Sequence, residues 1–318
     1  MTAKPKIFDA HHHLWSLTAC HYPWLMARGA RRFFGDPTPI QRDYLIDEFM
    51  GDAADFELVG STHIQVGTKE EDAVIETKWL QDVNSRSGGI PTAIVAFADL
   101  RRPDLDQLLS AHSASAAFRG VRQIVGRHPS EDGKAGTAAL LDDPRFLRGL
   151  KLLERRKLTF DLQLTENQYW GALRLFGHSP ELKTSLCHFA SPWDLSKDGF
   201  GRWREAMRAF SELPQMSIKF SGFGMFKPDW TIDDVKPYVD TALELFGPKR
   251  CMTGSNFPVD KLYGGYERIW RAVDALITDS SARDRVAIEN AVDFYSAPLA
   301  ASRSKSVRSA RAPSRMKA

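Results

Sequence analysis

The stretch FDAHHHLW (residues 8–15) continues the apolar start KIF (6–8) and places three histidines at the end of the first predicted strand. An open, doubly wound sheet usually has a glycine-rich phosphate-binding turn at this point of the chain. Histidines stand there instead, and the later GFGMF (222–226) contains only one glycine pair. The stretch therefore favours a closed barrel, in which side chains at the carboxyl ends of the strands form the site.

Short apolar, β-rich runs recur along the chain, and most lead into a polar segment with helical spacing. The runs lie at 6–10, 57–66, 92–100, 118–125, 158–164, 184–190, 216–222 and 250–257. Segments with apolar residues at i, i+3 and i+4 include 70–86, 143–157, 203–213 and 235–247. Strands that alternate with helices pair in parallel, because each crossover helix carries the chain back. The pattern predicts a single-domain α/β fold, a (β/α)8 TIM barrel, over residues 1–300.

The last eighteen residues, ASRSKSVRSARAPSRMKA (301–318), contain six Lys or Arg and no acid. The whole chain has a formal net charge of +3, so the remaining residues carry −3. Because the end segment is rich in Ser, Ala and Arg and has no hydrophobic period, we expect a basic disordered tail. One short basic tail on an acidic body makes nucleic-acid binding the least favoured class of function.

Composition indicates a globular enzyme-sized chain without a membrane segment. Of the 318 residues, 43% are hydrophobic and 26% charged, and no apolar run approaches the roughly 20 residues that span a bilayer. The start MTAKPKIFDAHHH lacks the apolar core of a signal peptide. Cys20, Cys187 and Cys251 show no paired spacing, which is typical of free thiols. We therefore expect a cytoplasmic protein with a small-molecule substrate; a homo-oligomer is compatible with the sequence.

The histidines at the strand ends are the first candidates for chemistry. Residues i and i+2 of a strand share a face, so His11 and His13 are expected at the barrel mouth and His12 on the other side. His188 closes the sixth run and is expected at the same rim. Converging imidazoles can bind a divalent metal or polarise a carbonyl group. By contrast, His112 stands in a polar helical context and is expected on the surface.

Six motifs in order along the chain extend this pattern. They are AHHHLW (10–15), YPWL (22–25), GVRQ (120–123), CHFASP (187–192), IKFSG (218–222) and GSNFPVD (254–260). Together they resemble the amidohydrolase-related branch of the amidohydrolase superfamily, amidohydrolase family 2. Within it, the chain is similar to sugar lactonases that open fuconolactone or rhamnonolactone and to 2-pyrone-4,6-dicarboxylate lactonase. The resemblance runs from about residue 6 to residue 295 and implies a (β/α)8 hydrolase.

The resemblance also implies roles for individual residues. It places His11, His13 and His188 in catalysis, and the same three would be the ligands of a metal. One divalent ion, most naturally zinc, is implied as the cofactor, and metal-independent catalysis stays open because several such lactonases work without a tightly held ion. The implied substrate-binding side chains are Arg122, Lys219, Asn256, Trp15, Tyr22, Trp24 and Trp193. The aromatic members come largely from residues 14–43, a connection long enough to be a lid or binding loop.

The eighth run departs from the family pattern. Many lactonases of the group have an aspartate there as the base that activates water, whereas this chain has Asn256. An amide cannot take up a proton near neutral pH. Asp260, four residues further on, is a candidate catalytic base, and His13 or His188 are the alternatives.

The leading hypothesis is a hydrolase that opens the lactone of a sugar acid or a related carboxylated ring. Water would attack the ring carbonyl while the histidines, with or without a metal, stabilise the oxyanion. The first rival is a metal-dependent decarboxylase of the same superfamily. The second is a barrel that binds sugar acids and has lost catalysis through Asn256.

Overall fold

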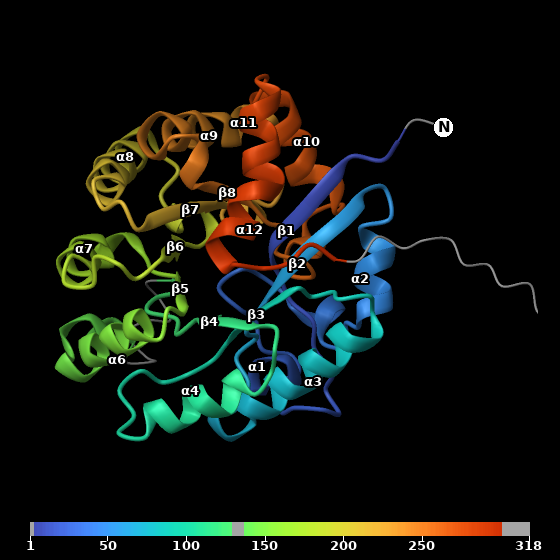
Figure 1. The fold of residues 1–318 in the computed structure, drawn as a ribbon. Helices are drawn as coiled ribbons and strands as arrows, with labels where there is room; N and C mark the ends of the chain where they lie inside the picture. Colours follow the sequence, from blue (N-terminus) through green and yellow to red (C-terminus); the bar gives the residue numbers. More distant parts are fainter. Residues whose placement is uncertain (1–2, 129–136, 301–318) are drawn as a thin grey trace, which may run out of the picture.

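Eight parallel strands form one sheet whose spatial order, β1 to β8, is the order of the chain (Figure 1). The computed structural model describes residues 3–128 and 137–300, so the expected tail lies outside the described residues. The strands are β1 Lys6–His12, β2 Glu57–Ile64, β3 Ala93–Ala96, β4 Phe118–Val121, β5 Thr159–Leu162, β6 Thr184–Leu186, β7 Met216–Phe220 and β8 Cys251–Thr253. Each lies inside or overlaps one predicted run, which confirms the TIM-barrel prediction. Most of the runs extend past the strand, because their last residues leave the sheet and stay buried.

Helices surround the strands on the outside (Figure 1). The α-helices are α1 Pro23–Met26, α2 Ile46–Asp52, α3 Ala73–Arg86, α4 Leu105–Ser113, α6 Pro144–Arg155, α7 Tyr169–Phe176, α8 Lys197–Ser211, α9 Ile232–Phe246, α10 Glu267–Leu276, α11 Ser280–Asp284 and α12 Asn290–Tyr295. Short 3₁₀ turns lie at η1 Thr38–Ile40, η2 Glu70–Asp72, η3 Thr137–Asp142, η4 Glu166–Gln168, η5 His188–Ala190, η6 Phe223–Met225, η7 Pro248–Arg250 and η8 Asp260–Leu262, and a π-helical turn at η9 Arg285–Glu289. The buried faces of the long α-helices carry the apolar residues whose helical spacing was noted in the sequence. None of the helices in the described ranges has the length and apolar character that a membrane crossing needs.

Backbone hydrogen bonds close the ring between β1 and the segment after β8. The Asn256 N–H donates to the His11 carbonyl oxygen at 2.7 Å, and the His13 N–H donates to the Phe257 carbonyl oxygen at 2.7 Å. Asn256 has φ +55°, a left-handed conformation that asparagine tolerates better than most residues. This closure sets Asn256 directly beside the histidines of β1.

Asp9 stabilises the same contact between β1 and the segment after β8. Its carboxylate accepts hydrogen bonds from the Ser255 N–H at 2.9 Å, the Ser255 hydroxyl at 2.6 Å and the Tyr266 hydroxyl at 2.8 Å. Burial raises the pKa of Asp9 to about 6, against the opposing effect of these bonds. Between Asp9 and His12 the β1–β2 register shifts, so Asp9 faces this contact while His11 turns towards the barrel interior.

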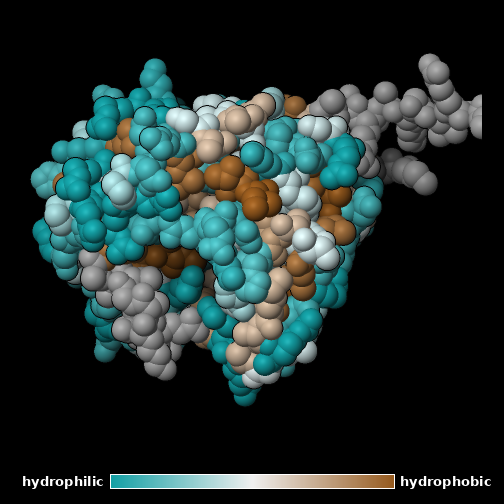
Figure 2. Space-filling view, turned by 90° about the horizontal axis from the view of Figure 1, so that it is seen from below, coloured by the Kyte–Doolittle hydropathy of each residue, from teal (hydrophilic) through white to brown (hydrophobic). Residues whose placement is uncertain are grey.

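A small apolar cluster fills the interior below the strand ends. Its members include Phe8, Ile64, Val95, Met252 and Tyr295, all buried. Tyr295 comes from α12, which contacts β1 and β8. The outer surface differs in character: the face in Figure 2 is mainly hydrophilic, with hydrophobic side chains in smaller patches. Because the buried apolar cluster fills it, the barrel interior is a packed core rather than a pore.

Candidate active site

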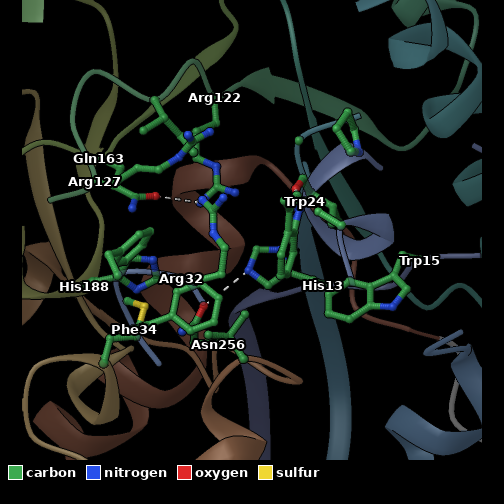
Figure 3. A pocket seen from close by; sticks show the side chains of 18 residues that line it. His13, Trp15, Trp24, Arg32, Phe34, Arg122, Arg127, Gln163, His188 and Asn256 are labelled. Atoms are coloured by element: carbon green, nitrogen blue, oxygen red, sulfur yellow. Dashed lines mark hydrogen bonds between the residues drawn. The ribbon is translucent and has the colours of Figure 1, made fainter. Parts of the chain in front are cut away.

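A cavity of about 490 Å³ lies at the carboxyl ends of the strands (Figure 3). Its lining comes from the segments that follow six of the strands and from the long connection after β1. The lining residues are His13, Trp15, Pro23, Trp24, Ala27, Arg32, Phe33, Phe34, Val66, Gly67, Arg122, Ile124, Arg127, Gln163, His188, Met225, Asn256 and Val259. An apolar wall with a few converging polar groups is typical of a small-molecule site.

His13 has a defined tautomer. Its Nδ1 lies 2.7 Å from the Ile64 carbonyl oxygen, which can only accept, so Nδ1 carries the proton. Nε2 is therefore unprotonated and carries a lone pair, and it lies 3.3 Å from the Oδ1 position of Asn256 (Figure 3). Because an amide oxygen cannot donate, neutral His13 is paired only when the amide turns its Nδ2 towards Nε2. The β2 carbonyl thus orients the imidazole and leaves a basic nitrogen towards Asn256.

His188 sits on a strained turn directly after β6. The four residues from His188 to Ser191 all have φ between +53° and +58°, a conformation that is costly for residues other than glycine. The His188 Nδ1 lies 3.0 Å from the Ser221 hydroxyl oxygen. Gly222 packs against the ring, and a Cβ at this position would lie 2.5 Å from Nδ1. The turn and this glycine together hold the imidazole at the cavity.

His11 lies under the other two histidines rather than in the cavity wall. Its ring centre is 4.4 Å from that of His188 and 5.2 Å from that of His13. The side chain is fully buried, and neither ring nitrogen has a hydrogen-bond partner among the described residues. His12 points the other way, bonds Ser61 at 2.9 Å and stacks on a phenylalanine of α2. His12 and His13 point in opposite directions as predicted, whereas His11 was expected at the barrel mouth and lies below the cavity.

All three histidines are neutral at neutral pH. Burial lowers the pKa of His13 to about 3, and the nearby Arg122 charge lowers it further. Burial also lowers the pKa of His188 and of His11, helped by Arg122 for His188 and by the neighbouring imidazole of His188 for His11. Neutral imidazoles can accept a proton or bind a metal.

Arg122 reaches the cavity from the segment after β4. Its Nη1 donates to the Gln163 Oε1 at 3.1 Å, and its Nη2 donates to the Gln65 carbonyl oxygen. The side chain is buried, and both of these acceptors are neutral. Burial lowers its pKa, although a guanidinium stays charged. A buried cation whose hydrogen-bond acceptors given above are neutral can stabilise an anion in the cavity.

Lys219 does not line the cavity. It points into the barrel interior, where its Nζ donates to the Asp161 carboxylate, and both side chains are 0% exposed. The Tyr295 hydroxyl donates to the same carboxylate at 2.9 Å. The structure thus brings Lys219 close to the histidines from below, without direct access to a bound substrate.

Asp260 is also kept apart from the cavity. It lines a smaller hollow with Gly222 and Tyr263, on the other side of Asn256. Burial raises the pKa of Asp260 to about 7, and its Oδ1 has no hydrogen-bond partner among the described residues. This placement leaves the two histidines that line the cavity as the nearer bases.

The predicted aromatic residues divide into two groups. Trp15 and Trp24 line the cavity, and the Trp24 indole N–H donates to the Val66 carbonyl oxygen at 2.7 Å. Tyr22 is fully buried behind them, and Trp193 lies beside the cavity, where its indole N–H donates to the Arg127 carbonyl oxygen at 2.9 Å. The tryptophans of the long connection are therefore the ring-binding candidates.

Several lining residues were not predicted. Arg32, Phe33 and Phe34 come from the long connection, whose aromatic content signalled a binding loop without indicating which residues turn inwards. Gln163 could have been found, because it follows Asp161 by two residues at the end of the fifth run. Arg127 follows an irregular segment and had no periodic signal.

The three histidines offer nitrogen donors for a metal ion, although the donor set that the described residues bring within 4.8 Å consists of His11, Asp161 and Cys187. His13 and His188 each use Nδ1 on a neighbouring group, which leaves Nε2 for a ligand bond, as is common for metal-binding histidines. His11 has two buried nitrogens without a partner among the described residues. Nitrogen donors of this kind suit zinc.

Residues 8–297 match the amidohydrolase family, and the chain belongs to this family. The resemblance seen in the sequence is thereby confirmed.

Comparison with individual proteins agrees. The uncharacterized protein y4mH of Sinorhizobium fredii is 38% identical over 297 residues, 91% of this chain and 98% of that protein. An L-fucono-1,5-lactonase of Burkholderia multivorans is 27% identical over 277 residues, with 84% of this chain and 86% of that enzyme covered. A solved amidohydrolase from the same Burkholderia species, with bound zinc, superposes with a TM-score of 0.78 at 24% identity and covers 92% of this chain and 99% of its own.

Proposed function

We propose that the chain is a lactonase that opens the lactone of a sugar acid or of a related carboxylated ring. The observation that carries this proposal is the buried Arg122 guanidinium, which faces the same cavity as His13 and His188 and is held by neutral acceptors. Lactone hydrolysis creates negative charge twice, on the carbonyl oxygen during attack and on the carboxylate of the product. The relation to L-fucono-1,5-lactonase supports the same chemistry.

His13 is the proposed base. Its lone pair at Nε2 takes the proton of the attacking water, while the Ile64 carbonyl oxygen stabilises the imidazolium through Nδ1–H. A base within the cavity typically contributes a factor of about 10² to 10⁴ to the rate. The proton then passes to the ring oxygen as the carbonyl–oxygen bond breaks. This assignment supplies the base that Asn256 cannot be.

Arg122 and Asn256 are the proposed donors to the oxyanion. Both side chains line the cavity, and the Asn256 amide carries two N–H groups, of which the contact with His13 needs only one. Preorganised donors of this kind stabilise charge as it develops. A divalent ion held by His11, His13 and His188 would supply Lewis-acid polarisation of the carbonyl at the same place.

A hydrolysis assay with a pH indicator tests the proposal. It uses a panel of aldonolactones and pyrone carboxylates, each with chelator and with added zinc. Saturable turnover of at least one lactone is expected, above the spontaneous rate. Turnover that survives chelation would favour His13 as sole base, whereas turnover only with zinc would assign the histidines to a metal. Absence of turnover in all conditions would contradict the proposal and favour the decarboxylase or the binding barrel.

A further inference from the structure

Below the cavity, three donor atoms of different chemistry lie together inside the barrel. A ring nitrogen of His11, a carboxylate oxygen of Asp161 and the sulfur of Cys187 all lie within 4.8 Å of one another. All three side chains are 0% exposed. Nitrogen, oxygen and sulfur donors in this arrangement are typical of a zinc site. The set shares only His11 with the three histidines near the cavity.

The ammonium group of Lys219 already lies beside these three donor atoms. The Lys219 ammonium donates to the Asp161 Oδ1, and the Cys187 sulfur lies 3.9 Å from the same oxygen. The Tyr295 hydroxyl donates to Asp161 at 2.9 Å, and its ring centre lies 5.2 Å from the Lys219 Nζ. The carboxylate oxygen that a metal would use is thus bonded to an ammonium group.

We propose that Lys219 is a built-in cation that takes the place of a metal ion at the His11–Asp161–Cys187 set. A buried carboxylate needs a counter-charge, and Lys219 supplies it. Stability alone does not explain the pair, because apolar residues of similar volume usually serve a core as well or better. The unpartnered nitrogens of His11 mark a donor set that the ammonium satisfies only in part.

The proposal has a consequence for the site above. An ammonium on a covalent tether cannot dissociate, so this positive charge persists when metals are removed. It lies near enough to disfavour positive charge on all three histidines. A divalent ion bound by those histidines would share His11 with the lower set and would be repelled by Lys219.

Cobalt(II) binding by the purified full-length chain tests this inference. The variant Lys219→Met removes the cation and leaves all three donors. It is expected to bind Co²⁺ at the His11–Asp161–Cys187 set and to show the near-ultraviolet charge-transfer absorption of a thiolate–cobalt bond. The wild-type chain is expected to lack this absorption, because a metal ion bound by His11, His13 and His188 would have no sulfur ligand. Lys227→Met, which breaks the surface pair Lys227–Asp234, is the matched control and should behave as wild type.

Two further variants secure the assignment. Lys219→Met combined with Cys187→Ala should lose the absorption, which would place the ion on this sulfur. If Lys219→Met fails to fold without metal, zinc should restore its cooperative thermal transition, whereas Asp161→Asn/Lys219→Met should gain nothing from zinc. A thiolate band in the wild type, a folded Lys219→Met variant without the band, or an unfolded one that zinc does not restore would each overturn the proposal. None of these readouts measures turnover, so the result is independent of the lactonase proposal.

Discussion

The His13 Nε2 lies 3.3 Å from the side-chain amide of Asn256, across the seam where β1 meets the segment after β8. Two backbone hydrogen bonds of 2.7 Å fix this approach, one from the Asn256 N–H and one from the His13 N–H. The contact joins Asn256, where the resemblance led us to expect an aspartate, to the histidine with a defined lone pair. The identity of the catalytic base therefore depends on the pair His13 and Asn256 rather than on residue 256 alone.

Asn256→Asp tests whether the site is adapted to asparagine. A carboxylate cannot donate to an oxyanion and repels it, so we expect kcat to fall by about a hundredfold, the usual effect of losing one such donor. Steady-state kinetics on the best lactone of the panel measures this. A gain in kcat would instead indicate that a carboxylate at position 256 serves the reaction better than the amide does.

His13→Ala removes the proposed base. We expect kcat to fall by about 10² to 10⁴ with a smaller change in KM, because the water loses its proton acceptor while the cavity keeps its other walls. The exposed His178 offers a matched control, and His178→Ala should keep full activity. Equal activity of wild type and His13→Ala would transfer the role to His188.

Arg122→Met removes the buried guanidinium while keeping an unbranched side chain. We expect a loss of at least about a hundredfold in kcat/KM, since the developing oxyanion loses a charged donor. Arg122→Lys should recover only part of this loss, because an ammonium cannot reproduce the two parallel donors. Turnover that is insensitive to both changes would limit Arg122 to a structural role.

The pH dependence of kcat/KM separates His13 from Asp260. A base is active when unprotonated, and the pKa of Asp260 is raised to about 7 by burial, so an Asp260 base would make the rate climb through pH 7. Burial and Arg122 lower the pKa of His13 to about 3, so with His13 as base the profile should be flat from pH 6 to 8. Asp260→Asn should leave that profile unchanged, because Asp260 lines a different hollow from His13.

The buried carboxyl group of Glu76 is expected to make the free energy of unfolding depend on pH. It is 1% exposed, close to the buried Tyr22 hydroxyl, and burial raises its pKa to about 8. Since the folded pKa exceeds the unfolded one, its stabilising contribution is full at acidic pH and is lost as the pH rises through 8. A tenfold difference in proton affinity between the folded and unfolded chain corresponds to about 1.4 kcal/mol of stability.

Urea unfolding at pH 5 and pH 9 measures this contribution. The wild-type free energy of unfolding should fall by up to a few kcal/mol between the two, and that of Glu76→Gln should fall less. Glu71→Gln, at an exposed position, should follow the wild type. Parallel curves for Glu76→Gln and the wild type would show that this carboxyl does not titrate with unfolding.

Patterns along the chain indicated the right fold and part of the site. Alternation of apolar runs and helical segments is a property of neighbouring residues, so it predicted all eight strands and the opposite directions of His12 and His13. The same reasoning failed for His112, which is fully buried and bonds Thr77 at 2.8 Å instead of lying on the surface. A helix face can be read from its period, but a polar residue inside it gives no sign of a buried partner on another helix.

Local sequence patterns were enough to establish that a barrel forms and that His11, His13 and His188 gather at its carboxyl end, because strand ends and period-two faces are local properties. Which side chains meet there depends on the tertiary structure. Lys219 follows the strand pattern of a site residue, yet inter-strand register pairs it with Asp161 below the cavity. Asp260 stands four residues from Asn256 and lines a different hollow. Ring closure and register act between residues far apart in the chain, so they leave no periodic signal in the sequence.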